Sequence, residues 1–195
     1  MNSRIKILSN IKSNKPATVS LPEIDAELFN EELEKLSNFK KMVEVVGGTV
    51  FSANSNNDVL EQLKVLYPEA RTNYSLLADS TTFNTLALSE IQNPHDLEKL
   101  DILVLEGVFG VAENGAIWIT DAEMPMRVLP FIAKHLVLVL DKSNIVPYLH
   151  QAYTQLERAE YDFGLFISGP SKTADIEQSL VIGAQGALSL SVFLK

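Results

Sequence analysis

The sequence predicts an α/β protein with a mostly parallel sheet and helices on both faces. Three observations lead to this class. Segments with strand-like and helix-like patterns alternate along most of the chain, and the predicted strands are almost wholly apolar, as in sheets covered on both sides. In addition, 46% of the 195 residues are apolar. A chain of this length and composition can bury a core of its own without disulfides or metal ions.

The N-terminal part predicts two helices. Ile5, Leu8 and Ile11 recur at a spacing of three, which predicts a short helix that ends before Pro16. We therefore expect a detachable helical arm over residues 1–16 and one α/β domain over residues 17–195. Apolar residues then recur every three or four positions from Phe29 to Val46, which predicts one long helix that ends before Gly47.

The rest of the chain alternates between the two periods. Pro94 predicts the first turn of a brief helix, since proline is tolerated at that position. The other predicted helices span residues 58–67, 143–159 and 173–183. The predicted strands span residues 49–52, 75–78, 101–105, 116–120, 135–141, 162–167 and 188–194.

Charge and cysteine content exclude several classes of function. The net charge of −9 repels nucleic acids and anionic lipids, so we expect neither as a partner. The chain has no cysteine, which excludes disulfides and thiolate-bound zinc or iron–sulfur clusters. We expect no cofactor in this chain, and a redox metal would have to reside on a partner.

Metal binding and export are also not expected from the sequence. The three histidines, His95, His135 and His150, share no ligand spacing, so we expect no metal site. Residues 1–16 are basic but lead into no apolar segment of the kind found in signal peptides. The aliphatic run from Leu136 to Leu140 is far shorter than a membrane-spanning helix, and we expect a soluble cytoplasmic protein.

The first candidate site follows the predicted strand that ends at Ile167. Gly169 permits a tight turn and Pro170 fixes the next φ angle, so that the N–H groups of residues 171–173 open the predicted helix toward an anion. Lys172 adds a positive charge. Alternatively, Ser171 and Thr173 cap the helix, while Asp175 and Glu177 complement its dipole. The spacing differs from a Walker A loop, which argues against an ATPase.

The second candidate site lies in residues 107–116, between two predicted strands. Asn114-Gly115 is typical of a hairpin turn, and a glutamate beside such a turn is ordinarily solvated. The functional alternative is that Glu113 lies in a cleft as a nucleophile or general base.

These two segments resemble a known family. The strings SGPSKTADIE at residues 168–177 and VIGAQG at residues 181–186 resemble the C-terminal signature of the LUD (lactate-utilisation) domain family, in its protein C type. Residues 107–119 are similar to the Ile-Ala-Glu-Thr-Gly-Thr stretch of that family. The resemblance implies a fold like that of sugar-phosphate isomerases and coenzyme A transferases. It also implies a role in oxidation of L-lactate to pyruvate beside two partner proteins, one of which carries iron–sulfur clusters.

The sequence departs from the family at one loop. Ala112 to Ala116 stands where the family has Glu-Thr-Gly-Thr, so two hydroxyl groups are missing. The string AENG at residues 112–115 instead resembles the Ser-Glu-Asn-Gly motif of coenzyme A transferases. That second resemblance implies that Glu113 attacks an acyl thioester and forms an anhydride, then a glutamyl thioester.

The sequence leaves three functions open. The first is a subunit of an L-lactate-oxidising system that binds a small anion and depends on an iron–sulfur partner for redox chemistry. The second is a free-standing acyl transferase that uses Glu113. The third is a protein that binds a small anion or a phosphate ester. The expected ligand-binding residues are Ser168, Gly169, Ser171, Lys172, Thr173, Asn114 and Gly115, supported by Pro170, Asp175 and Glu177.

Overall fold

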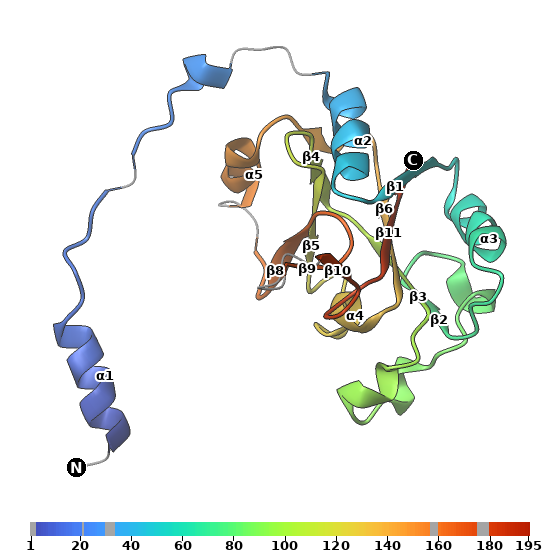
Figure 1. Cartoon of the computed structure of the whole chain (residues 1–195), viewed down its shortest axis with the longest axis horizontal. Helices are drawn as coiled ribbons and strands as arrows, with labels where there is room; N and C mark the ends of the chain where they lie inside the picture. The colour runs from blue at the N-terminus through green and yellow to red at the C-terminus, as the bar shows by residue number, and fades with distance from the viewer. Residues whose placement is uncertain (1–2, 21, 30–33, 157–159, 175–179) are drawn as a thin grey trace. The chain divides into compact units, whose positions relative to one another are not determined.

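The computed structural model describes residues 3–20, 22–29, 34–156, 160–174 and 180–195 (Figure 1). The chain divides into two compact units, residues 1–32 and residues 33–195. The first unit contains helix α1, Ser3–Ser13, and a 3₁₀ helix, η1, Ala26–Phe29. No residue of α1 is buried. The domain boundary that we expect after residue 16 stays a prediction.

The second unit contains the α/β part of the chain. Its α-helices are α2 (Lys35–Val45), α3 (Asn56–Leu66), α4 (Leu129–Ile132) and α5 (Leu149–Leu156). Short 3₁₀ helices cover Ser80–Thr82, Leu88–Glu90 and Pro94–Leu97. The strands are β1 (Thr49–Ser52), β2 (Asn73–Ser75), β3 (Ile102–Glu106), β4 (Phe109–Val111), β5 (Ala116–Thr120), β6 (His135–Leu140), β7 (Ile145–Val146), β8 (Gly164–Ile167), β9 (Lys172–Ala174), β10 (Leu180–Ile182) and β11 (Ser189–Leu194). No helix in the described part of the chain is long and apolar enough to cross a membrane.

A five-stranded parallel sheet forms the centre of this unit. Its strand order is β1-β11-β6-β3-β2, and each neighbouring pair is parallel. Strands β6 and β11 pair over their full lengths, from His135 opposite Ser189 to Leu140 opposite Leu194. Both faces of these strands are covered, which explains the continuous apolar runs at residues 136–140 of β6 and 192–194 of β11. The expected α/β class and mostly parallel central sheet are therefore confirmed.

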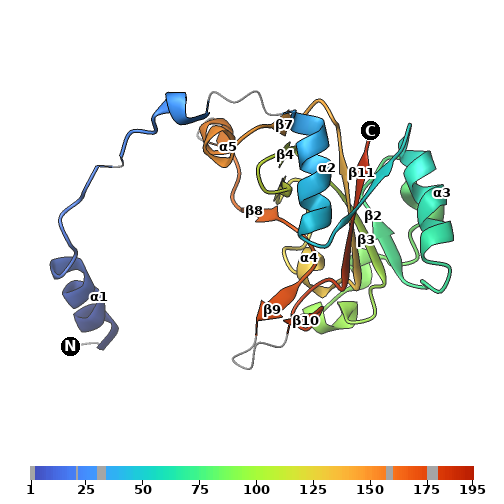
Figure 2. The same ribbon diagram turned by 45° about the horizontal axis from the view of Figure 1, so that its top comes forward.

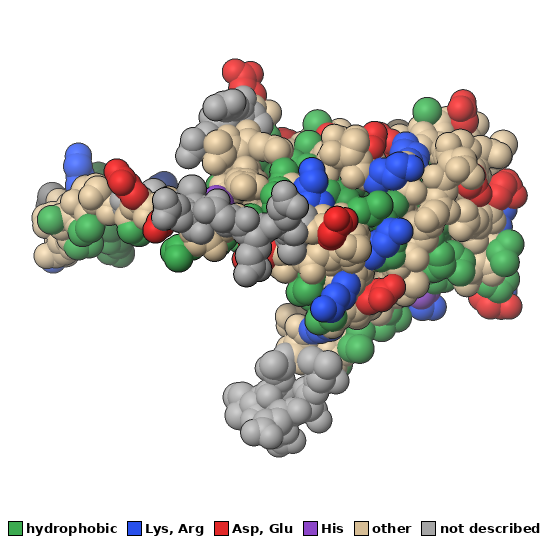
Figure 3. Space-filling model, turned by 90° about the horizontal axis from the view of Figure 1, so that it is seen from above, with side chains coloured by type: hydrophobic (Ala, Val, Ile, Leu, Met, Phe, Trp, Pro, Cys, Tyr) green, Lys and Arg blue, Asp and Glu red, His purple; other side chains and the backbone are tan. Residues whose placement is uncertain are grey.

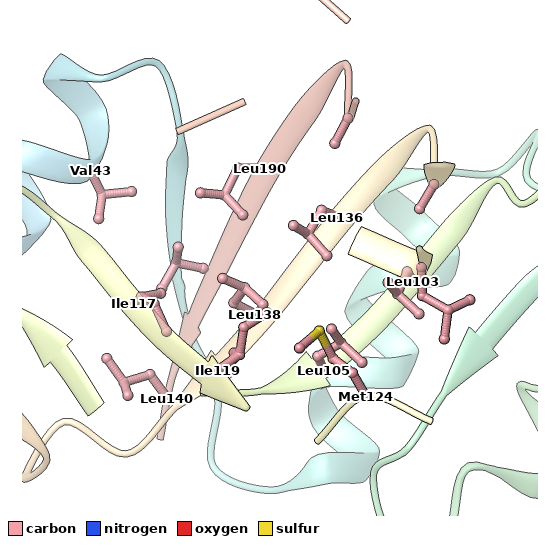
Figure 4. Packing of buried hydrophobic residues seen from close by; sticks show 14 of the residues in the cluster. Val43, Leu103, Leu105, Ile117, Ile119, Met124, Leu136, Leu138, Leu140 and Leu190 are labelled. Atoms are coloured by element: carbon pink, nitrogen blue, oxygen red, sulfur yellow. The ribbon is translucent and has the colours of Figure 1, made fainter. Parts of the chain in front are cut away.

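The two faces of the central sheet are covered differently. On one face, Val59, Leu60 and Leu63 of α3 join a cluster with Val137 and Val139. The alternate residues of β6 point to the other face, where α2 and a second sheet cover them (Figure 2). Figure 4 shows this packing, with Val43 from α2 and Ile117 from β5 beside the leucines of the central strands. Helices therefore lie on both faces, as expected, and a second sheet, which was not expected, covers one of these faces together with α2.

The second sheet is mixed and has the strand order β7-β4-β5-β8. Strand β5 is antiparallel to both β4 and β8, whereas β4 and β7 are parallel. Its outer face packs against Ala152 and Leu156 of α5 through an aromatic cluster that contains Phe109, Trp118 and Phe166. The segment before Gly115, expected to be a loop, thus contains strand β4. The expected turn at Asn114-Gly115 is confirmed, because it joins the antiparallel strands β4 and β5.

Three predicted helices differ from the structure. The long helix is α2 alone, because Glu34 before it has ψ 84° and Ala26–Phe29 is a separate 3₁₀ turn; residues 30–33 lie outside the described residues. The helix expected over residues 143–159 begins at Leu149, since Ile145 and Val146 pair with β4 and Val146 precedes a proline.

The helix expected over residues 173–183 is wrong. Lys172–Ala174 and Leu180–Ile182 form an antiparallel pair of strands, with Thr173 opposite Val181. Thr173, Val181 and Ile182 are β-branched residues, which favour strands. Residues 175–179 lie outside the described residues.

Candidate functional site

The structure brings the two candidate segments together. Strand β8 pairs with β5 so that Ile167 lies opposite Ile117, which places residue 168 beside the β4–β5 hairpin. The Ser168 hydroxyl donates a hydrogen bond of 2.9 Å to the backbone carbonyl of Asn114, although the residues are 54 positions apart. The candidate ligand-binding residues of both segments therefore meet at one corner of the second sheet.

Two glycines hold this corner against the end of α2. Gly115 and Gly169 have positive φ angles of 68° and 78°. A Cβ atom on Gly115 would lie 2.7 Å from the backbone nitrogen of Val43, and one on Gly169 would lie 2.5 Å from the carbonyl oxygen of Val46. Because these neighbours are backbone atoms of α2 and its C-cap, only glycine fits at either position.

Glu113 is part of the hairpin turn and contacts helix α5. Its carboxylate Oε2 accepts a hydrogen bond of 2.8 Å from the backbone nitrogen of Leu149, the first residue of α5. Its own backbone nitrogen donates to the Pro147 carbonyl at 3.0 Å. A carboxylate at a helix N-terminus satisfies an otherwise unpaired N–H group and complements the helix dipole. Glu113 therefore links the hairpin to α5, and its catalytic role stays a prediction.

A cavity of about 300 Å³ lies next to Ser168. Polar side chains come from Ser171, Lys172 and Gln185, and glycine backbone from Gly169 and Gly186. The remaining lining residues, mostly apolar, are Pro130, Phe131, Leu136, Leu165, Phe166, Ile167, Pro170 and Ala187. Apolar walls with a few polar groups are typical of small-molecule sites.

The cavity is not the anion site expected at a helix start. Because β9 replaces the predicted helix, the N–H groups of residues 171–173 do not open a helix. The Ser171 nitrogen donates to the Ala187 carbonyl at 2.9 Å, and the Ser171 carbonyl accepts from Gly183 at 3.0 Å. Thr173 lies in the β9–β10 ladder, whereas Asp175 and Glu177 lie outside the described residues. The polar side chains, rather than helix amides, are what the structure offers a ligand.

Lys172 lies near both the cavity and the C-terminal end of α2. A Cβ atom on Gly47 would be 3.4 Å from Cε and Nζ of Lys172. Gly47 directly follows the C-cap residue Val46, so the ammonium group lies where the helix dipole is negative. The Lys172 side chain therefore lies between the cavity and the C-terminal end of α2.

Sequence reasoning assigned no role to several cavity residues. Gln185 and Gly186 stood in the family-like string, which was the available signal for them. Phe131 in α4 and Leu136 in β6 carried no signal, because only the fold brings them to residues 169–172. Conversely, Ser168, Asn114 and Gly115 lie at the corner beside the cavity, and they are not among the residues that line it.

A second polar cluster lies at the amino-terminal edge of the central sheet, where His135 begins β6 and Ser189 begins β11. The His135 ring stacks on Tyr67 with 4.3 Å between centroids, and its Nδ1 is 2.8 Å from the Ser189 hydroxyl. Burial and the neighbouring Lys134 ammonium lower the pKa of His135, while the Asp101 carboxylate opposes this shift. Within the described ranges, no three His, Asp or Glu side chains are grouped so that they could hold a metal ion.

Comparison with known proteins identifies the family. Residues 90–194, from before β3 to the end of β11, match the model of the LUD domain. This match covers more than half of the chain. The chain belongs to the LUD domain family. The matched residues include the hairpin, the Ser168 corner and the cavity, so the candidate site lies within the LUD domain.

Individual relatives of this LUD protein are distant. It is 34% identical over 112 residues to a Bacillus pumilus protein named lactate utilization protein C, covering 54% of this chain and 46% of that protein. A Geobacillus kaustophilus protein with the same name is 29% identical over 103 residues, covering 50% of this chain and 43% of that protein. The chain thus spans about half the length of the curated relatives it matches.

One crystal structure supports the fold of most of the chain. A DUF162 family protein from Deinococcus radiodurans has a TM-score of 0.60 to this LUD protein, at 17% identity. The similarity covers 83% of this chain and 96% of that one. At this identity the match supports the α/β fold and carries no information about activity.

Proposed function

We propose that this LUD protein is a subunit of a system that oxidises L-lactate to pyruvate, and that it binds a small carboxylate in the cavity beside Lys172. The relatives named lactate utilization protein C support the lactate role. We further propose that it acts with an iron–sulfur partner. Oxidation of lactate releases two electrons and two protons, and a chain without cysteine has no thiolates to hold an iron–sulfur cluster that would accept them.

The observation that carries the proposal is the composition of the cavity. Residues 169–172 and 185–186 come from the two halves of the family-like signature, and they line one cavity of about 300 Å³. This volume is at the lower end of the range for small-molecule sites. Each string contributes polar side chains to the cavity, Ser171 and Lys172 from the first and Gln185 from the second, and a shared ligand would contact both.

The lining residues fit a small hydroxy or keto acid. The Lys172 ammonium supplies a positive charge for a carboxylate, and Ser171 and Gln185 supply hydrogen-bonding groups for a hydroxyl or keto oxygen. Phe131, Leu136 and Phe166 supply apolar surface for a methyl group. In this proposal the chain binds and orients the acid, and electrons leave through the partner.

A thermal-shift series tests the ligand. With L-lactate or pyruvate at a hundredfold its dissociation constant, we expect a stabilisation of about 2.7 kcal/mol, or roughly 5–10 °C for this chain length. Lys172→Gln should abolish most of the shift, whereas the exposed Lys142, away from the cavity, provides the matched control Lys142→Gln. Acyl-coenzyme A and sugar phosphates belong in the same panel. A shift with these ligands, and none with lactate or pyruvate, would overturn the proposed substrate.

A separate experiment tests the partner. The isolated chain should show no lactate oxidation, and anaerobic co-expression with an iron–sulfur subunit of a lactate-utilisation system should give a stable complex that oxidises lactate. Failure of the two chains to associate under these conditions would contradict the partner role.

A further inference from the structure

Strand β8 lies at one end of the second sheet, so only one of its two edges pairs with a strand of that sheet. The paired edge faces β5. Leu165, Phe166 and Ile167 all line the cavity, although successive side chains of a strand point to opposite faces. A cavity that contacts all three residues therefore lies along an edge of the strand, and the edge away from β5 is the one available to it.

The main chain of Phe166 points to this edge. Phe166 lies opposite Trp118 of β5, and the Trp118 carbonyl accepts a hydrogen bond of 2.9 Å from the Val108 nitrogen, on the other side of β5. In an antiparallel ladder, hydrogen-bonded pairs alternate with pairs whose N–H and C=O groups point away from each other. Phe166 and Trp118 form a pair of the second kind. The N–H and C=O groups of Phe166 therefore point to the cavity side of β8.

These two groups have no hydrogen-bond partner in the described part of the chain. The ladder with β5 does not use them, and no other described residue bonds to the main chain of Phe166. Phe166 is partly buried, and main-chain groups shielded from water are almost always hydrogen bonded. The strand edge thus offers one donor and one acceptor, side by side, to a molecule in the cavity.

A small acid needs such short-range contacts in this protein. The chain has a net charge of −9, and Lys and Arg side chains are interspersed with Asp and Glu side chains on the face that Figure 3 shows. A surface of mixed sign attracts an anion less than a broad positive one does. Lys172 brings one positive charge to the cavity, and hydrogen bonds from fixed main-chain groups would add to it.

A 2-hydroxy acid presents the complementary pair of groups. In a hydrogen-bonded antiparallel pair, the opposite residue contributes an N–H donor and a carbonyl acceptor on either side of one Cα atom. L-Lactate carries a hydroxyl donor and a carboxylate acceptor on either side of one carbon atom in the same way. Its carboxylate can accept from the Phe166 N–H while its hydroxyl donates to the Phe166 carbonyl. Pyruvate has no donor at this position and would leave the carbonyl unpaired.

We infer that the main chain of Phe166 binds the acid and makes the cavity selective for 2-hydroxy acids over 2-keto acids. This inference rests on the proposed function and names the substrate, rather than the product, as the tighter ligand. Oxidation of lactate to pyruvate removes the hydroxyl hydrogen, so the bond to the Phe166 carbonyl is lost when the product forms. A site built to pair with a hydroxyl group discriminates against an analogue without one.

Titration calorimetry of the unmodified full chain with three acids tests the selectivity. L-Lactate should bind about tenfold more tightly than pyruvate, because pyruvate loses one hydrogen bond and leaves its acceptor unpaired. 2-Methoxypropanoate keeps the 2-oxygen and lacks its hydrogen, so it should bind no more tightly than pyruvate. Equal or tighter binding of pyruvate would overturn this inference and leave the carboxylate site standing. Binding of neither lactate nor pyruvate would overturn the proposed ligand as well.

Phe166→Pro and Phe166→Ala form a matched pair that tests the N–H group. Both variants lose the ring that packs against Trp118, and only proline also removes the N–H. Proline is tolerated on an edge strand where the N–H lies outside the ladder. Relative to Phe166→Ala, Phe166→Pro should bind lactate and pyruvate each about tenfold more weakly, with the ratio between the two acids unchanged.

Urea denaturation checks that both Phe166 variants fold. Equal affinities of two folded variants for both acids would contradict the role of the N–H group and overturn the inference. If Phe166→Pro does not fold, the comparison of the three acids in the unmodified chain still decides, because it depends on the Phe166 carbonyl alone.

Discussion

The central parallel sheet and the second, mixed sheet of this LUD protein differ in the burial of their strands and in their contribution to the candidate site. The central strands are buried on both faces and belong to two of the hydrophobic clusters. The second sheet has shorter strands, and all four residues of β8 are only partly buried. Yet the second sheet positions the hairpin, Ser168 and one wall of the cavity. The longest buried strands are thus β6 and β11 of the central sheet, whereas the candidate site is built at the edge strand β8 of the second sheet.

The largest expected effect contrasts the two sheets directly. Leu138 in β6 is fully buried, so Leu138→Ala should cost about 3 kcal/mol in the free energy of unfolding. Leu165 in β8 is partly buried, and Leu165→Ala should cost roughly half as much while also changing the cavity wall. Urea denaturation measures both. Equal losses would show that the second sheet is as important for stability as the central one.

The next largest loss of stability is expected at Gly169, where the Ser168 corner contacts the C-terminal end of α2. Gly169→Ala places a methyl group against the Val46 carbonyl at positive φ, and should cost about 2 kcal/mol. Gly47→Asn is the matched control, because asparagine tolerates positive φ and the neighbours of Gly47 are side-chain atoms at 3.4 Å or more. The measurement is urea denaturation with and without lactate. If Gly47→Asn lost as much free energy of unfolding as Gly169→Ala, the contact with the Val46 carbonyl would not be the cause of the loss.

Substitution of Glu113 should cause a smaller loss of stability, and the residue also distinguishes a capping role from acyl transfer. Glu113→Ala removes the carboxylate that accepts from Leu149 and should cost about 1 kcal/mol, as for other helix caps, while Glu113→Gln retains an acceptor oxygen and should cost less. Thermal denaturation measures this difference.

The same residue tests the acyl-transferase alternative. Exposure to an acyl-coenzyme A followed by borohydride reduction and mass spectrometry should leave Glu113 unmodified if it serves only as a cap. A labelled Glu113 would instead support acyl transfer through a glutamyl intermediate.

The contrast between the sheets also explains what the sequence could predict. The strands at Ile102–Glu106, His135–Leu140 and Ser189–Leu194 are visible as apolar runs, because burial on both faces leaves little choice of residue. Strand β4 has three residues and is stabilised by partners on both sides, so its local pattern resembles a loop. Residues such as Ser171 and Thr173 suit a helix cap as well as a strand, and pairing between β9 and β10 decides between them.

The candidate site was also predictable only in part, because tertiary packing alone brings some of its residues together. Glycine and asparagine at the turn reflect local backbone geometry, which a sequence pattern records. Phe131 and Leu136 reach the cavity through the tertiary arrangement of α4, β6 and β8, and no spacing rule connects them to Lys172. Local chemistry was therefore easier to predict than the walls around it.

The amino-terminal edge of the central sheet should respond to pH. Because the pKa of His135 is lowered in the folded protein, the unfolded chain binds more protons below about pH 6.5. The contribution of His135 is thus fully present above this pH and is lost as the pH falls toward the folded-state pKa. The free energy of unfolding, measured between pH 7.5 and 5, should decline less steeply for His135→Asn than for the unmodified chain. Parallel curves would show that another group causes the decline.

Removal of the arm should have the smallest effect on stability. No residue of α1 is buried, so deleting residues 2–16 removes no core contact and should shift the melting temperature of the α/β unit by less than about 2 °C. Calorimetry of the shortened and complete chains measures this shift. A deletion that unfolds the protein would place the arm among the stabilising elements. An intact deletion variant that still binds lactate would instead show that folding and ligand binding need only the rest of the chain.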